Sequence, residues 1–329
     1  MTVADVVKSF QPRHQLAALF GEREAAPIRA VDGVSFEIGK GELLGLIGES
    51  GSGKTTLARL LTRLEVCDRG EILFLGRRNV AEMRRAELRD FYRNVQMIFQ
   101  DPYESLNPRF TVLETVIEPL RAQGIGNREG RAQKVAASLA RAGLRPPERY
   151  LRRFPHELSG GERQRLSIAR ALVLEPRLIV ADEPVSMLDV SIRAGILNLL
   201  KELSLSDGLA VLYISHDLST TRYLCDRIII MYQGRFVEIG SPEQVLDAPK
   251  HPYARMLRAA VPSADPEERR ASLPEQAEEA GEPLAANACA YAPECPQAMA
   301  VCRARAPLLV DRGAGHRVAC HLYDPEVVP

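Results

Sequence analysis

Short apolar runs alternate with longer amphipathic stretches along most of this chain. The run Leu43–Ile47 contains no polar side chain, which is typical of a strand buried on both faces of a parallel sheet. Other apolar runs of strand length lie at residues 95–99, 178–182, 209–215 and 227–231. The helix-like segment 191–203 connects two of these runs and suits a strand–helix–strand crossover. The pattern therefore predicts an α/β fold.

Two further regions complete the predicted elements. Alternating apolar residues at 31–38 indicate a half-exposed strand, and the glycine-bounded segment 70–76 is typical of another. From about residue 101 to 173 the apolar period is helical, with Val135 and Leu139 on one face. We therefore expect a helical subdomain at residues 101–173, inserted between strands of the α/β core.

Composition divides the chain into three parts. Residues 264–285 are rich in acidic side chains and contain three prolines, as in a solvated linker. Four of the cysteines follow this stretch. We predict a main domain at residues 1–262, an acidic linker at 263–286 and a cysteine-containing region at 287–329.

Charge and hydropathy restrict the surroundings of the protein. The 329 residues include 43 Lys and Arg and 43 Asp and Glu, so net charge offers no electrostatic basis for binding nucleic acid. No apolar stretch reaches the roughly 18 residues of a membrane span, and residues 1–20 lack the apolar centre of a signal peptide. We expect a cytosolic protein that meets a membrane only through a partner. In that compartment the six cysteines suggest thiols or metal ligands rather than disulfides.

A glycine-rich segment follows the first buried run. It reads Gly48, Glu49, Ser50, Gly51, Ser52, Gly53, Lys54 and Thr55, which fits the phosphate-binding P-loop pattern G-x-x-x-x-G-K-[ST]. Its glycines let backbone N–H groups point at phosphate oxygens, and the helix that starts near Thr56 directs its positive end at them. Lys54 adds a charge at the β- and γ-phosphates, and the Thr55 hydroxyl suits Mg²⁺. These residues, Thr56 included, predict a nucleotide-binding site.

Five more motifs follow the P-loop in order. They are Gln100 after an apolar run, Leu-Ser-Gly-Gly-Glu-Arg-Gln at 158–164, Asp182-Glu183 at a strand end, Ser-Met-Leu-Asp ending at Asp189, and His216. Each is short, but in this order they resemble the Q-loop, signature, Walker B motif, D-loop and switch histidine of the ATP-binding-cassette (ABC) ATPases. Met187 departs from the alanine that is usual in the D-loop.

The resemblance implies roles in ATP hydrolysis, with ATP and Mg²⁺ as cofactors. Asp182, Thr55 and Gln100 are implied as the Mg²⁺ ligands, directly or through water. Glu183 is implied as the general base, and Gln100 and His216 as groups that position the attacking water and the γ-phosphate. Hydrolysis needs charge neutralisation, an aligned water and a base or positioning group. By themselves, Asp182 and Glu183 are also compatible with caps of the turn that follows the strand.

The signature segment is implied to act on a second subunit. It comprises Ser159, Gly160, Gly161 and Glu162, and in the family it contacts the γ-phosphate of ATP bound to the partner, so that two chains sandwich two ATP molecules. A Ser-Gly-Gly turn before a helix is also typical of an ordinary N-cap. The adenine is expected to stack on Phe10, with Phe20 as the alternative; either aromatic also suits the core.

Three segments narrow the resemblance to the ATPases of dipeptide, oligopeptide and nickel importers. They are residues 101–109, 154–161 and the His-Pro-Tyr at 251–253, and their form resembles the second, F-type, ATPase of these systems. The implied fold is a P-loop ABC nucleotide-binding domain with an antiparallel β subdomain, a helical subdomain and a small cysteine-containing C-terminal extension. The implied partners are a homologous D-type ATPase, two transmembrane permease subunits and, indirectly, an extracytoplasmic substrate-binding protein, at the cytoplasmic face of the membrane.

Two functions remain open from the sequence. In one, the chain hydrolyses ATP to energise import of dipeptides, oligopeptides or nickel chelates. In the other, it is a soluble ATPase accessory to a complex such as carbon–phosphorus lyase. The segment 251–253 and the cysteines favour the importer. A permease helix is then expected to dock in a groove beside residues 101–109, with Tyr103 and Leu106 as contacts or, alternatively, as residues that only close the core.

Four cysteines near the C-terminus form a separate candidate site. They are Cys289, Cys295, Cys302 and Cys320. Thiolate sulfur suits iron–sulfur clusters or zinc, and the resemblance favours a [4Fe–4S] cluster. Spacing alone leaves zinc and four unconnected thiols open as alternatives. Because the cysteines are far along the chain from the ATP motifs, we expect them to have a structural or docking role.

Overall fold

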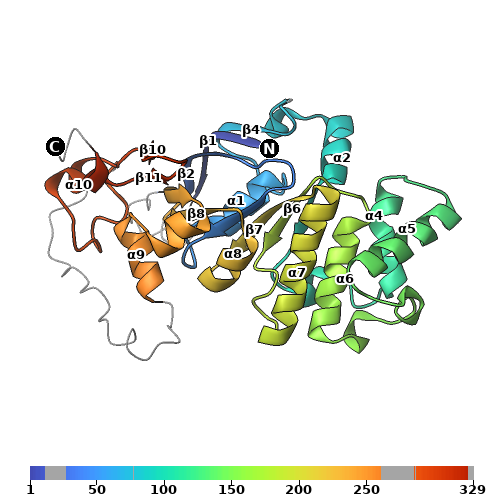
Figure 1. Ribbon diagram of the computed structural model, residues 1–329. Coiled ribbons are helices and arrows are strands. Elements are labelled where there is room, and N and C mark those ends of the chain that lie inside the picture. Colours follow the sequence, from blue (N-terminus) through green and yellow to red (C-terminus); the bar gives the residue numbers. More distant parts are fainter. Residues whose placement is uncertain (12–26, 77, 261–284, 286, 325–329) are drawn as a thin grey trace, which may run out of the picture.

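The computed structural model describes residues 1–11, 27–76, 78–260, 285 and 287–324 (Figure 1). Phe20 and the linker predicted at residues 263–286, apart from Ala285, lie outside the described residues. Figure 1 shows a central sheet with a group of helices on one side of the molecule and the C-terminal segment on the opposite side. The sheet therefore connects the two flanking parts of the chain.

An eight-stranded sheet forms the centre of the molecule, with strand order β10-β11-β9-β8-β3-β7-β6-β5. Its parallel strands are β3 (Leu43–Ile47), β5 (Val95–Ile98), β6 (Leu178–Asp182), β7 (Ala210–Ser215) and β8 (Arg227–Tyr232). The carboxyl ends of parallel strands meet at one edge of a sheet. The P-loop, Gln100, Glu183 and His216 follow four of these strands and therefore reach the same edge.

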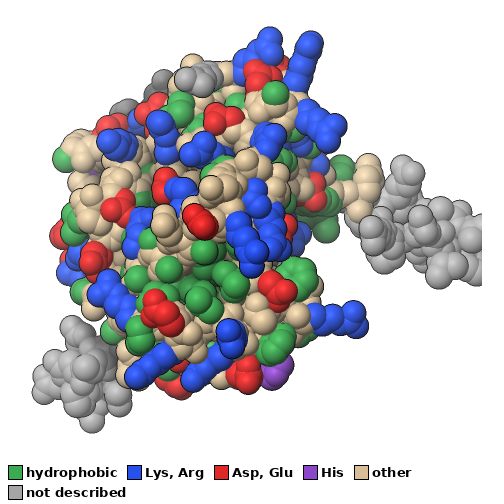
Figure 2. Space-filling model, turned by 90° about the vertical axis from the view of Figure 1, so that its right-hand side faces the viewer, with side chains coloured by type: hydrophobic (Ala, Val, Ile, Leu, Met, Phe, Trp, Pro, Cys, Tyr) green, Lys and Arg blue, Asp and Glu red, His purple; other side chains and the backbone are tan. Residues whose placement is uncertain are grey.

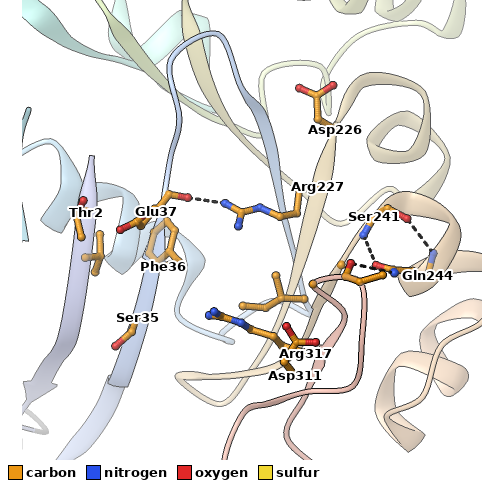
Figure 3. A pocket seen from close by; sticks show the side chains of 15 residues that line it. Thr2, Ser35, Phe36, Glu37, Asp226, Arg227, Ser241, Gln244, Asp311 and Arg317 are labelled. Atoms are coloured by element: carbon orange, nitrogen blue, oxygen red, sulfur yellow. Dashed lines mark hydrogen bonds between the residues drawn. The ribbon is translucent and has the colours of Figure 1, made fainter.

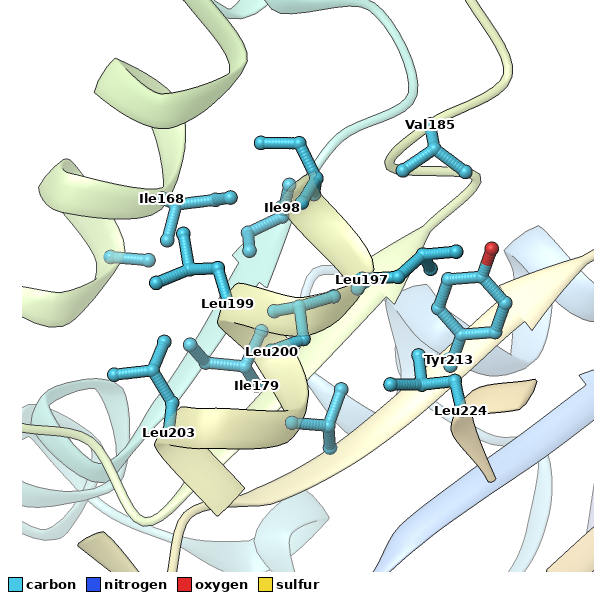
Figure 4. Close-up of a cluster of buried hydrophobic side chains, with 14 of the residues drawn as sticks. Ile98, Ile168, Ile179, Val185, Leu197, Leu199, Leu200, Leu203, Tyr213 and Leu224 are labelled. Atoms are coloured by element: carbon cyan, nitrogen blue, oxygen red, sulfur yellow. The ribbon is translucent and has the colours of Figure 1, made fainter. Parts of the chain in front are cut away.

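Consecutive residues of the parallel strands face two different cores. In β6, Leu178 and Val180 join one buried cluster, whereas Ile179 and Ala181 join the other. Figure 4 shows part of the second cluster, in which leucines of α7 (Val190–Asp207) pack over the strands near Tyr213. Because both faces are covered, these strands are apolar throughout. The predicted α/β fold is confirmed.

A smaller antiparallel sheet covers the core that contains Leu178 and Val180. Its strand order is β2-β1-β4, with β1 (Thr2–Phe10), β2 (Ile28–Glu37) and β4 (Arg69–Leu73). Val34 and Ile72 pack in the same cluster as Leu57 of α1 (Lys54–Leu61). The strand predicted at residues 70–76 ends at Leu73, because the next residues include Leu75 and Gly76 in the left-handed backbone region, which a strand cannot contain.

The helical subdomain lies between β5 and β6 in the chain. Its helices are α3 (Pro102–Ser105), α4 (Val112–Ala122), α5 (Arg128–Arg141) and α6 (Gly160–Leu172). Leu106 is only 3% exposed and closes the core beneath the loop, so it is unavailable as the docking contact expected from the sequence. Tyr103 is 61% exposed, and its ring lies 4.1 Å from the guanidinium carbon of Arg163. Of the two expected contacts, only Tyr103 can meet a partner.

Several further elements complete the described part of the chain. They are α2 (Arg85–Asn94), α8 (Leu218–Leu224), β9 (Arg235–Gly240), α9 (Pro252–Ala259), α10 (Ala300–Ala304), β10 (Val310–Asp311), β11 (Arg317–Val318), single 3-10 turns at Val80–Glu82, Pro147–Arg149, Pro155–Glu157 and His321–Tyr323, and a π-helical turn at Glu243–Asp247. Within the described residues, none of the helices combines the length and apolarity needed to cross a membrane.

The C-terminal extension is joined to the main sheet. Its strand β11 pairs antiparallel with β9, so the two short strands β11 and β10 extend the sheet beyond β9. Glu238 of β9 is fully buried and accepts the backbone N–H groups of Lys250 and His251. The ring of His316, from the loop before β11, lies 2.6 Å from the same carboxylate through Nε2. A buried carboxylate with three partners thus links the extension to the core.

Candidate active site

The P-loop lies against strands from both sheets, β2 of the small sheet and β8 of the main sheet. A Cβ at Gly53 would overlap the carbonyl oxygen of Ala30 in β2, and Gly53 has a φ of 105°. A Cβ at Gly48 would overlap the carbonyl oxygen of Met231 in β8. These two glycines are therefore required by close backbone approach as well as by the turn itself.

Lys54 stands at the start of α1 with its ammonium inside the loop. The Nζ atom donates hydrogen bonds of 2.7 Å to the carbonyl oxygens of both Gly48 and Glu49. Burial lowers the pKa of Lys54, and the nearby carboxylates of Glu183 and Asp182 oppose that shift. The loop thus surrounds a buried cation close to two acidic side chains.

Asp182 and Thr55 form an oxygen pair beside the loop. Asp182 ends β6 and is 5% exposed. Burial raises the pKa of Asp182, and a hydrogen bond from the Thr55 side chain is the first effect that opposes it. Carboxylate and hydroxyl oxygens are hard donors of the kind that Mg²⁺ takes together with phosphate and water. The donor set therefore fits Mg²⁺.

Glu183 is held by two side chains from neighbouring strands. Gln100 donates from Nε2 to one carboxylate oxygen of Glu183 at 3.0 Å, and Nδ1 of His216 lies 3.0 Å from the other. Glu183 has a φ of 47°, and its backbone N–H donates to Ile214 of β7. A left-handed backbone is costly for a residue with a side chain. The surrounding contacts therefore fix one orientation of this carboxylate at the sheet edge.

The signature turn is the N-terminus of α6. Ser159 caps the helix: its hydroxyl accepts the N–H of Glu162, whose carboxylate accepts the N–H of Ser159. The hydrogen bond that the Ser159 backbone donates to this carboxylate, followed by a smaller effect of the bond from the Ser159 hydroxyl, lowers the pKa of Glu162. A Cβ at Gly161 would crowd Ile192 in the first turn of α7, so the turn lies against the segment that begins at Asp189. Within one chain, Ser159 is a helix cap.

Phe10 ends β1 on the small sheet and is 40% exposed. It pairs with Ile28 of β2, the strand whose Ala30 touches the P-loop, and the ammonium of Lys8 lies 5.4 Å from the ring centroid. The ring is thus solvent-accessible on the sheet that borders the loop. The alternative aromatic, Phe20, lies outside the described residues.

The four C-terminal cysteines lie in one neighbourhood. The pKa of Cys320 is raised to about 11 by burial and, to a smaller extent, by the thiols of Cys295, Cys289 and Cys302. The backbone N–H of Cys289 donates to the carbonyl of Cys302. Thiols suit iron–sulfur clusters and zinc. Among the residues that the structure describes, however, no three His, Cys, Asp or Glu side chains are placed so that they could hold a metal ion.

Sequence reasoning missed one contact with the P-loop. The hydroxyl of Tyr253 accepts the backbone N–H of Glu49 at 3.1 Å, although the two residues are 204 positions apart. From the sequence, Tyr253 served only as a mark of the subfamily. The available signal was the His-Pro-Tyr sequence at the start of a helix. That signal does not indicate which residue Tyr253 contacts.

A cavity of about 560 Å³ lies away from all these groups (Figure 3). It is lined by β1, β2, β9 and the extension, and includes Glu37, Arg227 and Arg317. Arg227 begins β8, so the cavity is near the amino ends of the parallel strands, whereas the P-loop follows a carboxyl end. The cavity is therefore distinct from the candidate active site.

Comparison with known proteins agrees with this geometry. Residues 31–186 match the family model described as ABC transporter, and residues 237–302 match the model described as oligopeptide/dipeptide transporter, C-terminal region. A putative peptide import ATP-binding protein of Brucella ovis is 44% identical over 91% of this chain and 93% of its own. The oligopeptide transport ATP-binding protein AppF of Bacillus subtilis is 43% identical over 98% of this chain and 97% of its own.

Solved structures show the same fold. A dimeric ATP-binding cassette, in a post-hydrolysis state bound to ADP and phosphate, has a TM-score of 0.63 and 30% identity, covering 73% of this chain and 98% of that one. The fold and the P-loop site define a nucleotide-binding domain of the ATP-binding-cassette class. The chain belongs to the family of ABC transporter ATP-binding proteins, and its C-terminal region is that of the oligopeptide/dipeptide group.

Proposed function

We propose that this protein is the ATP-hydrolysing subunit that energises peptide import by an ABC transporter. The observation that carries the proposal is the carboxylate of Glu183, held by Gln100 and His216 at the sheet edge that also presents the P-loop. The names of the relatives, which describe peptide import and oligopeptide transport, support peptides as the cargo. Their nearly full-length match favours the importer over an ATPase accessory to a non-transport complex.

In this proposal the chain's own groups divide the work of hydrolysis. The P-loop N–H groups and Lys54 bind the phosphates, with Thr56 extending the binding set and Phe10 receiving the adenine. Thr55 and Asp182, with Gln100, hold Mg²⁺, which supplies charge neutralisation when bound. Glu183 takes a proton from the attacking water, and Gln100 and His216 orient that water and the γ-phosphate.

Changing Glu183 to Gln tests the proposal. The amide keeps the size of the side chain but cannot accept a proton, so turnover should fall about 10²–10⁴-fold while ATP affinity is retained. Lys54→Ala, in contrast, should weaken nucleotide binding itself. Phosphate release and titration with a fluorescent nucleotide separate the two effects. Near-normal turnover by Glu183→Gln would show that the base is wrongly assigned.

The signature residues are proposed to complete the site of a second subunit. Ser159, Gly160, Gly161 and Glu162 form a helix N-terminus, which presents backbone N–H groups to an anion. Asp189 begins the neighbouring helix α7. The similarity to a dimeric cassette supports an ATP sandwich, and the subfamily pattern suggests a homologous D-type ATPase as the partner.

A permease pair is proposed as the membrane partner, with this chain peripheral at the cytoplasmic face. A groove of about 390 Å³ lies between the α1–β5 region and the helices α4 and α6, and Leu64, Tyr92 and Phe99 line it with exposed apolar side chains. Figure 2 shows the face on the side of α4 and α5, where hydrophobic side chains gather with Lys and Arg side chains around them. A short amphipathic permease helix fits such a groove.

The cysteine region is proposed to bind a metal through Cys289, Cys295, Cys302 and Cys320, with a [4Fe–4S] cluster as the first candidate and zinc as the alternative. The shared neighbourhood of the four thiols supports this proposal. Cys67 and Cys225 are outside the set: Cys225 is buried in the core beside β3, and burial raises its pKa. The four cysteines thus differ from the other two in having one another as neighbours.

A further inference from the structure

The first peptide group of the P-loop is held from both sides. The carbonyl of Gly48 and the N–H of Glu49 belong to the same planar peptide unit. That carbonyl accepts a hydrogen bond from Lys54 at 2.7 Å, and that N–H donates to the hydroxyl of Tyr253 at 3.1 Å. A rotation of this unit that broke one contact would also break the other. The orientation of the peptide, and with it the position of the Lys54 ammonium, therefore depends on Tyr253.

Tyr253 is itself fixed by the core and by the C-terminal extension. Its side chain is fully buried in α9, and the ring centroid lies 4.6 Å from that of Tyr232 and 5.4 Å from that of Tyr291. The Tyr232 hydroxyl donates to Glu294 at 2.7 Å. Both Tyr291 and Glu294 lie between the first two cysteines of the extension. The extension thus contributes one wall of the enclosure around Tyr253.

The hydroxyl of Tyr253 is suited to this contact. Burial raises its pKa, so the group stays neutral at physiological pH and presents an oxygen that accepts a hydrogen bond. The N-terminus of α9 is also held, because Nδ1 of His251 accepts the N–H of Tyr253 at 3.1 Å. In the segment 251–253, His251 caps α9, Pro252 occupies its first turn and Tyr253 contacts the P-loop.

We propose that Tyr253 is a positioning residue for ATP binding, and that the C-terminal extension sets its position through Tyr291. This inference rests on the proposed function, since it concerns the P-loop as an ATP site. The extension would then influence ATP binding, although it lies far along the chain from the P-loop. Tyr253 acts through the loop and Lys54, and has no part in the chemistry at Glu183.

Tyr253→Phe in the full-length protein tests the first part. The ring and its packing remain, and only the hydroxyl is lost. KM for ATP and the dissociation constant of a fluorescent ATP analogue should rise about three- to tenfold, as expected for one lost hydrogen bond, while kcat stays within about twofold. Hydrogen exchange of the Glu49 amide in nucleotide-free protein should become faster. That readout requires no turnover.

Tyr323→Phe is the matched control. Its hydroxyl also joins the extension to the core, through Arg255 at 2.7 Å and the carbonyl of Lys250, but its ring is outside the aromatic enclosure. KM and the exchange of Glu49 should be unchanged in this variant. If Tyr323→Phe raised KM as much as Tyr253→Phe, a general loosening of the extension would explain both results and the proposal would fail.

Tyr291→Leu tests the second part, because it removes the ring that packs against Tyr253 from the side of the extension. It should raise KM in the same direction, and its effect should shrink when combined with Tyr253→Phe, as for residues that act in series. Fully additive effects would overturn the role of the extension, and an unchanged KM and Glu49 exchange in Tyr253→Phe would overturn the positioning role. Loss of hydrolysis in Glu183→Gln is independent of all these outcomes, so a wrong function and a wrong positioning residue remain distinguishable.

Discussion

At the scale of single residues, the candidate site consists of groups held away from their relaxed state. Glu183 has a left-handed backbone, Asp182 is a carboxylate in a buried position, and Lys54 is a buried ammonium. The same burial that raises the pKa of Asp182 lowers that of Lys54, since both shifts disfavour the charged form. Such a site is less stable without its ligands, because phosphate and metal charges are what these groups are arranged to meet.

Asp182→Asn should therefore stabilise the nucleotide-free protein at neutral pH. A raised pKa in the folded state means that the carboxyl favours folding below its ordinary pKa, and that this contribution is lost as pH rises through the folded value. The amide removes the buried charge, so the melting temperature should rise at pH 7 and the gain should diminish at a pH below the ordinary range of Asp. Thermal melts of both proteins across pH provide the measurement.

The rate of ATP hydrolysis by Asp182→Asn should fall, although its stability rises. Asn offers Mg²⁺ no charge, so Asp182→Asn should lose most of its turnover even though it is the more stable protein. A melting temperature that is lower at pH 7 than that of the unchanged protein would contradict the burial argument, whatever the activity.

At the scale of elements, strand ends and helix N-termini together supply the site, and one of the helix N-termini has two roles. Ser159 caps α6 within its own chain, and the same turn is proposed to meet ATP on a partner. Capping and anion binding use the same N–H groups, since the first turn of a helix leaves several of them unsatisfied. The cap satisfies one of these donors and leaves others for an anion.

Ser159→Arg should block the sandwich while leaving the single chain able to bind ATP. The bulky cation would occupy the turn that meets the partner's nucleotide, so turnover should fall at least tenfold and ATP-dependent dimerisation should be lost, as measured by light scattering. Loss of the cap alone costs only about 1 kcal/mol of stability.

Asn127→Ala is the control for the cap. Asn127 caps α5 in the same manner, with its side chain accepting the N–H of Gly130, and α5 has no place in the proposed sandwich. This variant should lose comparable stability and keep its turnover. Normal hydrolysis by Ser159→Arg at high dilution would contradict the two-subunit proposal.

The groove proposed for the permease is also formed by several elements. Tyr103 does not line this groove, but it is exposed on the same short helix, α3, as Ser105, which does. Tyr103→Asp should uncouple hydrolysis from peptide uptake and leave nucleotide affinity largely intact, since the residue lies outside the P-loop. Leu308→Asp, which changes an apolar residue of the extension that is 81% exposed, should leave uptake unchanged. Crosslinking from position 103 in a preparation with the permease pair is the direct measurement. Crosslinks to soluble proteins alone would favour the accessory-ATPase alternative.

At the scale of the whole molecule, the extension and the ATPase core form one unit. Strand β11 continues the main sheet, Glu238 joins β9 to His316, and the three tyrosines connect the cysteine segment to the P-loop. The structural or docking role expected from the sequence stays a prediction, and the proposed positioning of Tyr253 adds an effect on ATP binding to it. Tyr291 of the extension packs against Tyr253 of α9, and Tyr253 in turn contacts Glu49 of the P-loop.

Anaerobically purified protein should contain bound metal, with about four iron and four sulfide per chain if the cluster is [4Fe–4S]. Cys302→Ser should lose the metal, whereas Cys67→Ser should retain it, because Cys67 lies beside Gly70 on the small sheet. Metal analysis and the absorption spectrum are the measurements. One zinc per chain would change the metal and keep the site; no metal in any anaerobic preparation would support four separate thiols.

The sequence by itself determined the parts of this protein that depend on neighbouring residues. The P-loop pattern is contiguous, so its glycines, Lys54 and Thr55 are recognisable without a fold. The apolar runs predicted the buried strands, since a strand covered on both faces needs apolar residues throughout. The segment 70–76 was misjudged at its end, because its alternation did not reveal the left-handed turn at Leu75.

Only the tertiary structure decided which distant residues touch. Gln100, Glu183 and His216 meet because β5, β6 and β7 are adjacent and parallel, and motif order along the chain does not specify strand order. Leu106 and Tyr103 belong to one short segment, yet one is buried and the other exposed. The bond from Glu49 to Tyr253 spans 204 residues and depends on how α9 and the extension pack, so no local pattern encodes it.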